Sequence, residues 1–273
     1  MKKGPIIISL APIGAWQESA VHSPYLHDEV AQDIQRCEEQ GAALVHLHVR
    51  DEAGEATTDM SVFNATVEAL RGNSSLILQG STGGVEGLSA AERCVVLSNE
   101  SVEMASLNMG STNFFEGVYV NSPDDIRYWA GEMKARRIVP ELELFSLTMI
   151  PASLRLRAEG ILEAPLRFSL CMGIPGAVPL DSRFIYMAAG LIPANAVWGL
   201  MLHGRTDPRL VAAALSLGAR WIRVGFEDSP YDVYGVAARR NLDLVAAMRA
   251  YIELLGYEVA DVATAREMLC LEA

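Results

Sequence analysis

The sequence predicts an α/β fold, a single (β/α)8 TIM barrel with its active site at the carboxyl ends of the strands. Eight apolar, β-branched runs alternate with helix-like stretches along 273 residues. These runs are continuously apolar, as is typical of a parallel sheet buried on both faces. An open doubly wound sheet is the rival, but no G-x-G-x-x-G motif follows the first strand. No linker or repeat is visible, so one catalytic domain is expected over 1–273.

The predicted strands are short runs bounded by turn residues. They cover 6–11, 42–49, 75–79, 102–109, 137–145, 165–172, 196–202 and 219–226. Helix-like stretches between them cover 27–40, 60–71, 122–136, 207–217 and 235–255. "SPDDI" (122–126) and "TDPRL" (206–210) carry helix start signals, and Gly41, Gly72 and Gly218 stand where helix C-caps are expected.

Charge and cysteine content narrow the function classes. The net charge of −12 argues against a nucleic-acid or anionic-membrane surface, which would need clustered Lys and Arg. The four cysteines are far apart with no C-x-x-C, which favours reduced thiols in a cytoplasmic enzyme. Two long apolar stretches, 1–16 and 184–202, are broken by proline and glycine, so neither is expected to act as a signal peptide or a membrane span.

The stretch "LVHLHVRDEAG" (44–54) places two histidines in an apolar strand. Side chains at i and i+2 of a strand share a face, so His46 and His48 are expected to point into the barrel near the carboxyl end of the second strand. Two imidazoles at this spacing can bind one Zn²⁺, which in catalytic sites takes a third protein ligand and keeps one open position. The alternative is a pair of hydrogen-bonded core histidines.

The third ligand is expected from "IRVGFEDSP" (222–230), at the end of the eighth strand. Glu227 and Asp228 close an apolar strand, and a buried Arg223 would need a carboxylate partner. Glu227 can then bind the metal, while Asp228, held by Arg223, can serve as a base. On this stretch alone, a structural ion pair that closes the barrel end is an equally good interpretation.

Other strand ends carry candidate substrate groups. "QGSTGG" (79–84) offers hydroxyls and backbone N–H groups to a carboxylate or phosphate, although an ordinary glycine-rich turn explains it as well. "MASLNMGS" (104–111) places Ser106 and Asn108 on one face. In "PELELF", Glu141 and Glu143 share a face, so one can point into the site while the other lies deeper. His203 is a lone histidine near the same rim, and its role stays open.

Taken together, "HLHVRDEAG", "QGSTGG", "EMASLNMGS", "PELELF" and "RVGFEDS" resemble the β-keto acid cleavage enzymes, in order and over nearly the whole chain. The resemblance implies a zinc-dependent (β/α)8 barrel that forms an oligomer, usually a tetramer. It also implies the reaction of a β-keto acid with acetyl-CoA to give acetoacetate and a new acyl-CoA.

Carried over motif by motif, the resemblance implies three groups of site residues. The zinc ligands would be His46, His48 and Glu227, and Asp228 paired with Arg223 would transfer the proton. The substrate carboxylate and reacting carbonyl would be held by Ser81, Thr82, Gly83, Ser106 and Asn108, with Glu143 also at the site.

Trp16 marks a departure from the family pattern. It stands where the member that cleaves 3-keto-5-aminohexanoate has a glutamate suited to an amino group, so we expect a β-keto acid with an apolar or uncharged tail instead. Two other functions stay open: a metal-dependent hydrolase of the amidohydrolase type, which places its His-x-His on the first strand, and a barrel that binds a ligand without catalysis.

Overall fold

The computed structural model describes residues 3–14, 24–83, 87–204 and 207–271. Eight parallel strands close into a barrel, because the last of them, β12, pairs with the first, β1. In barrel order they are β1 (Pro5–Leu10), β2 (Ala42–Leu47), β5 (Ile77–Gly80), β6 (Met104–Asn108), β9 (Val139–Leu144), β10 (Arg167–Met172), β11 (Val197–Leu202) and β12 (Trp221–Val224). The predicted TIM barrel and all eight predicted strands are confirmed.

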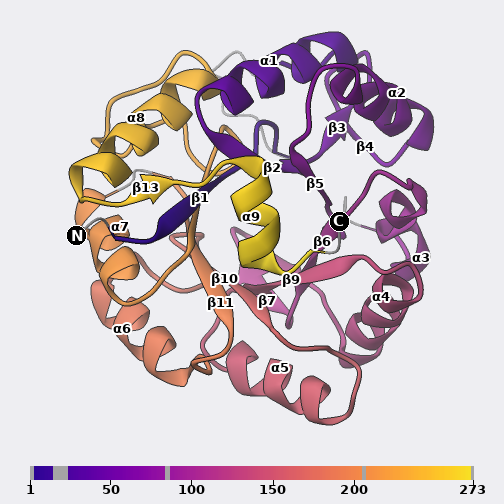
Figure 1. Cartoon of the computed structure of the whole chain (residues 1–273). Helices are drawn as coiled ribbons and strands as arrows, with labels where there is room; N and C mark the ends of the chain where they lie inside the picture. Colours follow the sequence, from indigo (N-terminus) through magenta and orange to yellow (C-terminus); the bar gives the residue numbers. More distant parts are fainter. Residues whose placement is uncertain (1–2, 15–23, 84–86, 205–206, 272–273) are drawn as a thin grey trace.

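Helices surround the barrel as an outer ring (Figure 1). The five predicted helices are α1 (His27–Glu39), α2 (Met60–Arg71), α4 (Pro123–Ala135), α7 (Pro208–Ser216) and α8 (Asn241–Leu254). Ser122 caps α4 and Asp207 caps α7, each by accepting a backbone N–H of the first turn. The prediction for α8 began too early, because residues 235–240 form a loop before Asn241.

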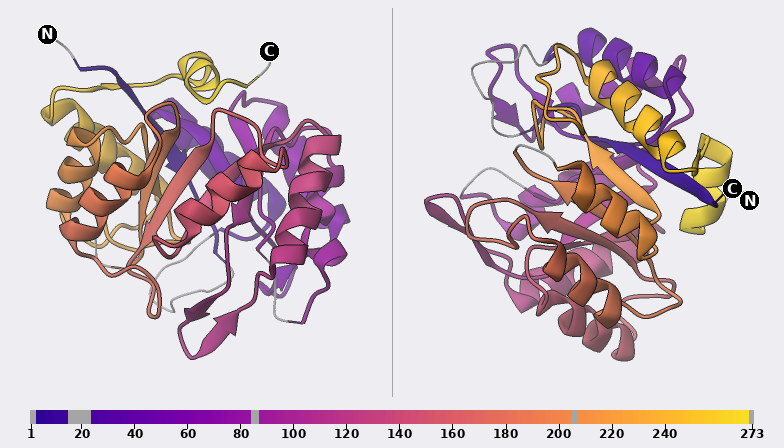
Figure 2. Two further views of the ribbon diagram at one scale, coloured as in Figure 1. Left: turned by 90° about the horizontal axis from the view of Figure 1, so that it is seen from below. Right: turned by 90° about the vertical axis from the view of Figure 1, so that its left-hand side faces the viewer.

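Several elements were not predicted from the sequence. They are the short helices α3 (Ala90–Arg93) and η1 (Val95–Ser98), the helices α5 (Met149–Ala158), α6 (Ser182–Leu191) and α9 (Val262–Leu269), and the short strand pairs β3 (Val49–Arg50) with β4 (Ala56–Thr57) and β7 (Thr112–Phe114) with β8 (Gly117–Tyr119). The β7–β8 hairpin projects from the end of the barrel opposite α9 and the two termini (Figure 2, left). It therefore stands beside the carboxyl ends of the strands.

The end of the barrel at the amino termini of the strands is closed by the last two elements of the chain. A short strand, β13 (Glu258–Val259), pairs with β1, and α9 follows it across the opening (Figure 1). Leu269 and Ala265 of α9 are buried in a cluster with inward side chains such as Ile7 and Trp221. The other end of the barrel is left for a site. Within the described residues, no helix is long and apolar enough to cross a membrane.

Two predicted strands end earlier than expected, and both stops lie at the candidate site. β2 ends at Leu47, so His48 lies just after the strand, and β12 ends at Val224. Gly225 breaks β12: its φ is +142°, and a Cβ there would lie 2.0 Å from the Ala11 carbonyl oxygen. Only glycine fits that contact. The chain therefore turns, and Glu227 and Asp228 follow in a loop rather than in a strand.

Candidate metal centre and active site

His46, His48 and Glu227 converge at the carboxyl end of the barrel. The Nε2 atoms of His46 and His48 lie 3.3 Å apart. Oε1 of Glu227 lies 3.7 Å from Nε2 of His46 and 3.8 Å from Nε2 of His48. All three ligand atoms fall within 4.8 Å of one another. Among the described residues, this is the one group of three or more such side chains that could hold an ion. The two histidines thus point to the same side, as predicted, although β2 ends before His48.

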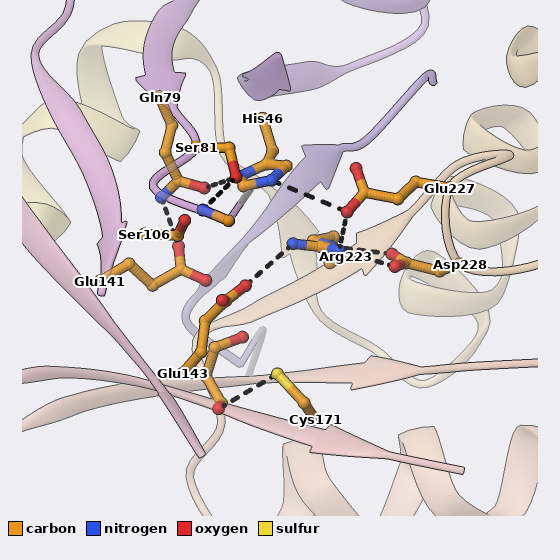
Figure 3. Close-up of polar contacts among 12 residues, drawn as sticks. His46, Gln79, Ser81, Ser106, Glu141, Glu143, Cys171, Arg223, Glu227 and Asp228 are labelled. Atoms are coloured by element: carbon orange, nitrogen blue, oxygen red, sulfur yellow. Dashed lines mark hydrogen bonds and ion pairs between the residues drawn. The ribbon is translucent and has the colours of Figure 1, made fainter. Parts of the chain in front are cut away.

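A buried hydrogen-bond chain orients His46 (Figure 3). Its Nδ1 lies 2.6 Å from Oε1 of Gln79, and Nε2 of Gln79 donates to Oε2 of Glu141 at 2.7 Å. An amide oxygen only accepts, so Nδ1 carries the hydrogen, and the lone pair of Nε2 faces His48 and Glu227. Metal-bound histidines in proteins are commonly held in this way by a second hydrogen bond.

Burial also keeps both imidazoles neutral. It lowers the pKa of His46 well below its usual value, and the nearby Arg223 cation adds to the effect. Burial likewise lowers the pKa of His48, although the Glu227 carboxylate opposes this shift. Both imidazoles are therefore neutral near neutral pH, as metal-binding histidines must be.

Glu227 is held close to the loop that follows β1. A Cβ on Gly14 would lie 3.0 Å from both Cα and Cγ of Glu227, so glycine permits this approach. Arg50, from the same motif as the histidines, donates to the Gly14 carbonyl oxygen and to that of Gly54. Oε2 of Glu227 is buried and has no hydrogen-bond partner. A buried carboxylate oxygen without a partner is costly, and a cation would supply one.

Arg223 is the buried cation of the site. Its guanidinium binds both oxygens of Asp228 at 2.7 and 2.8 Å, Glu227 at 2.9 Å and Glu143 at 3.3 Å (Figure 3). Burial raises the pKa of Asp228, against the lowering effect of Arg223, and raises that of Glu143 to about 8. The carboxylates of Glu227 and Asp228 therefore share one guanidinium beside neutral imidazoles, which leaves an excess of negative charge even with Glu143 protonated. A divalent cation would balance this excess of negative charge, so donor set and charge both fit a metal.

The predicted substrate residues line the ends of β5 and β6. Ser81 Oγ accepts from the Gly83 N–H at 3.0 Å, which leaves the hydroxyl hydrogen of Ser81 free to donate. The Thr82 hydroxyl donates to the Ser106 carbonyl oxygen at 2.6 Å and ties the two strand ends together, and its substrate role stays a prediction. Asn108 donates to Glu143 at 3.0 Å, and its own Oδ1 is buried without a partner.

Two further predictions concern the rim. Trp16 lies outside the described residues. His203 contacts Phe115, with ring centroids 5.5 Å apart, and does not belong to the metal-ligand group. Among the described residues no further histidine joins His46 and His48 in the group that could hold a metal, so the amidohydrolase alternative gains no support.

Comparison with known proteins decides the family. The family model for beta-keto acid cleavage enzyme matches residues 5–271. The chain belongs to the beta-keto acid cleavage enzyme family. The family match is to enzymes and extends over both halves of the site, so a barrel that only binds a ligand is not supported.

Relatives of this beta-keto acid cleavage enzyme match over nearly their full length. The chain is 31% identical over 271 residues to the 3-keto-5-aminohexanoate cleavage enzyme of Fusobacterium nucleatum, covering 98% of each chain. It is 35% identical over 274 residues to the 3-oxoadipate:acetyl-CoA acetyltransferase of Cupriavidus necator, covering 98% of this chain and 95% of that one. The barrel also resembles ObcA in its complex with oxaloacetate, with a TM-score of 0.77 and 20% identity over 92% of this chain and 68% of ObcA.

Two groups of functional residues in this family member escaped the sequence interpretation. Gln79 holds His46 because the two residues are partners in the β2–β5 register, and the only sequence signal was a polar residue at a strand end. Tyr119 and Arg93 reach the Ser81–Gly83 loop from the β7–β8 hairpin and α3. No sequence motif marked either of them.

Proposed function

We propose that this protein is a zinc-dependent enzyme that converts a β-keto acid and acetyl-CoA into acetoacetate and a new acyl-CoA. The observation that carries the proposal is the convergence of His46, His48 and Glu227 beside the Arg223–Asp228 pair in a member of this family. The relative from Cupriavidus necator is a 3-oxoadipate:acetyl-CoA acetyltransferase, which supports acetyl-CoA as the co-substrate.

A divalent cation bound by His46, His48 and Glu227 would supply Lewis-acid polarisation of the substrate carbonyl. Asp228 accepts the proton from the carbon between the ketone and the carboxylate, and Arg223 fixes the direction of its carboxylate oxygens. The raised pKa of Asp228, caused by burial, makes this carboxylate a stronger base than an exposed aspartate.

Group transfer then needs no side-chain nucleophile. The substrate carbanion attacks the thioester carbonyl of acetyl-CoA and forms a new C–C bond. The CoA thiolate leaves the former acetyl carbonyl and adds to the ketone carbon of the original acid. Retro-Claisen cleavage of the old C–C bond then leaves the new acyl-CoA and releases acetoacetate, whose carbanion takes the proton back from Asp228. The hydroxyls of Ser81 and Ser106 and the amide of Asn108 line the pocket where the negative charge develops and are proposed to stabilise it.

The tail of the β-keto acid is proposed to be apolar or uncharged, because Trp16 occupies the position where an amino-group-binding glutamate would stand. A panel of β-keto acids with apolar, acidic and amino tails, assayed with acetyl-CoA for acetoacetate release, tests both proposals. Release from apolar-tailed acids by the zinc-loaded enzyme is expected. Best turnover of 3-keto-5-aminohexanoate would refute the tail assignment, and no release from any acid would refute the reaction.

We also propose that the chain, as one catalytic domain, assembles as a homotetramer in the cytoplasm, as the family resemblance implies. Exposed Tyr186, Met187 and Leu191 give the outer face of α6 an apolar character that a subunit contact would cover. Light scattering during size exclusion should give about four times the chain mass of 29.6 kDa. A mass equal to that of one chain would refute this assembly.

A further inference from the structure

We propose that Tyr119 is an additional substrate-binding residue, whose hydroxyl donates a hydrogen bond to the carboxylate of the β-keto acid beside Ser81. This inference rests on the proposed function. It gives the β7–β8 hairpin a role in the site, although none of the sequence motifs includes this hairpin.

The hydroxyl of Tyr119 lies at the loop formed by Ser81, Thr82 and Gly83. A Cβ on Gly83 would lie 2.9 Å from the Tyr119 hydroxyl oxygen and 3.2 Å from Ser81 Oγ. The phenol therefore lies directly over the Ser81–Gly83 loop, and a side chain at position 83 would displace it. Asn108, which the sequence assigned to the substrate, also forms a side-chain hydrogen bond with Tyr119. Tyr119 thus shares the space of three predicted substrate residues.

Arg93 determines where the phenolic hydrogen of Tyr119 can point. Its Nη2 donates to the Tyr119 oxygen at 2.9 Å. A guanidinium cannot accept a hydrogen bond, so the hydroxyl hydrogen must point away from Arg93. Arg93 is itself fixed by the Thr82 carbonyl oxygen at 3.0 Å and the Asn121 side chain at 2.6 Å. The hydrogen bonds that Tyr119 forms with Arg93 and with Asn108 both lower its pKa, as hydrogen bonds donated to the phenol oxygen do, so the phenolic hydrogen is left for a ligand.

The hydroxyl donors of Tyr119 and Ser81 suit an anionic ligand. Burial raises the pKa of Tyr119 to about 12, so the phenol stays protonated and acts as a donor near neutral pH. The Ser81 hydroxyl already accepts from Gly83 and has a free hydrogen as well. Two hydroxyl donors thus meet over one loop, which suits the two oxygens of a carboxylate. Burial raises the pKa of the neighbouring Glu143 to about 8, so near pH 7 it is largely protonated and does not repel an anion.

Tyr119→Phe tests the proposal, with binding of acetoacetate and of methyl acetoacetate to the zinc-loaded protein measured by calorimetry. The variant keeps the ring, and Arg93 keeps its contacts with Thr82, Val120 and Asn121, so folding should be retained. Acetoacetate should bind about 10- to 100-fold more weakly, the usual effect of losing a hydrogen bond to a charged group. Methyl acetoacetate, which lacks the charge, should lose at most a few-fold in affinity, and KM for acetyl-CoA should stay unchanged.

Tyr128→Phe is the matched control, since this tyrosine is exposed on α4, and it should bind both ligands as the wild type does. Unchanged acetoacetate affinity in Tyr119→Phe, with a wild type that releases acetoacetate from β-keto acids, would overturn the inference alone. Equal weakening of acid and ester would also overturn it, because Tyr119 would then act only by shaping the loop. A wild type that neither binds acetoacetate nor releases it would overturn the proposed function and this inference with it.

Discussion

Asp228 directly follows the proposed metal ligand Glu227, yet Arg223 holds its two oxygens at 2.7 and 2.8 Å. Asp228→Asn should therefore keep the metal and lose turnover, because an amide cannot accept the substrate proton. We expect kcat to fall by roughly 10²- to 10⁴-fold, the usual contribution of a positioned base. Zinc content and acetoacetate release are the measurements.

Asp261→Asn is the control for this substitution. Asp261 caps α9 at the other end of the barrel, so its replacement should lower stability slightly and leave kcat unchanged. Full activity of Asp228→Asn would show that another group accepts the proton.

Glu143 is expected to make the metal-free protein less stable as the pH rises towards 8. Its folded-state pKa is raised by burial to about 8, against a usual value of 4.5. Between these two pH values the folded state binds more protons than the unfolded state, so the free energy of unfolding falls as pH rises through this window. Glu143→Gln should reduce that fall. Urea unfolding of the metal-free protein at several pH values between 5 and 8.5 measures it, and an identical pH slope in both proteins would contradict the assignment.

The candidate metal ligands could be predicted residue by residue, whereas the hydrogen bonds that orient them could not. Histidines two apart in a strand share a face whatever the rest of the fold, so His46 and His48 could be paired from spacing alone. The link from His46 through Gln79 to Glu141 depends on the register of β2, β5, β6 and β9, which the sequence does not specify. The same holds for the contact of Tyr119 with the Gly83 loop.

The turn after β12 shows how a backbone contact places Glu227 and Asp228, the proposed metal ligand and base. Gly225→Ala should force this turn away from the Ala11 carbonyl oxygen, 2.0 Å from the added Cβ, and so displace Glu227 and Asp228. We expect a loss of about 2–4 kcal/mol in unfolding free energy together with weaker zinc binding. Thermal unfolding and zinc titration measure the two effects.

Gly54→Ala is a matched control, because Gly54 also has a positive φ, +80°, but its added Cβ would meet nothing within 4 Å. It should cost about 1 kcal/mol and leave zinc affinity unchanged. Equal effects of the two substitutions would mean that only backbone strain matters at Gly225.

Element boundaries were harder to predict than elements. The eight barrel strands are marked by apolar runs, but β12 stops at Val224 because Gly225 turns against the Ala11 carbonyl oxygen, and no sequence pattern marks the stop of β2 at Leu47. The β7–β8 hairpin is built from three-residue strands, too short to give a pattern of alternating residues. Its importance for the site arises only from its place beside the barrel mouth.

The barrel as a whole separates stability from chemistry. α9 closes the amino-terminal end, while the candidate site lies at the carboxyl end (Figures 1 and 2). Leu269→Ala removes a side chain that is 2% exposed, so we expect a loss of about 2–5 kcal/mol in unfolding free energy with kcat and zinc content unchanged. Chemical denaturation and steady-state kinetics at low temperature measure both.

Leu254→Ala is its control, since Leu254 at the end of α8 is 74% exposed and should cost no more than about 0.5 kcal/mol. A fall in kcat for Leu269→Ala in the folded protein would show that the two ends of the barrel are coupled. The overall barrel was predictable because eight apolar runs alternate with helices. The closing role of α9 was not, since a short helix after the last strand gives no signal of where it packs.

Zinc stoichiometry tests most directly whether His46, His48 and Glu227 hold one ion. Wild-type protein dialysed against zinc and then buffer, and analysed by mass spectrometry for metal, should retain about one equivalent. His46→Ala, His48→Ala and Glu227→Ala should each lose it, while His203→Ala, on the rim but outside the group, should keep it. Retention of a full equivalent by all three alanine variants, or no zinc in the wild type, would contradict the metal centre and the reaction built on it.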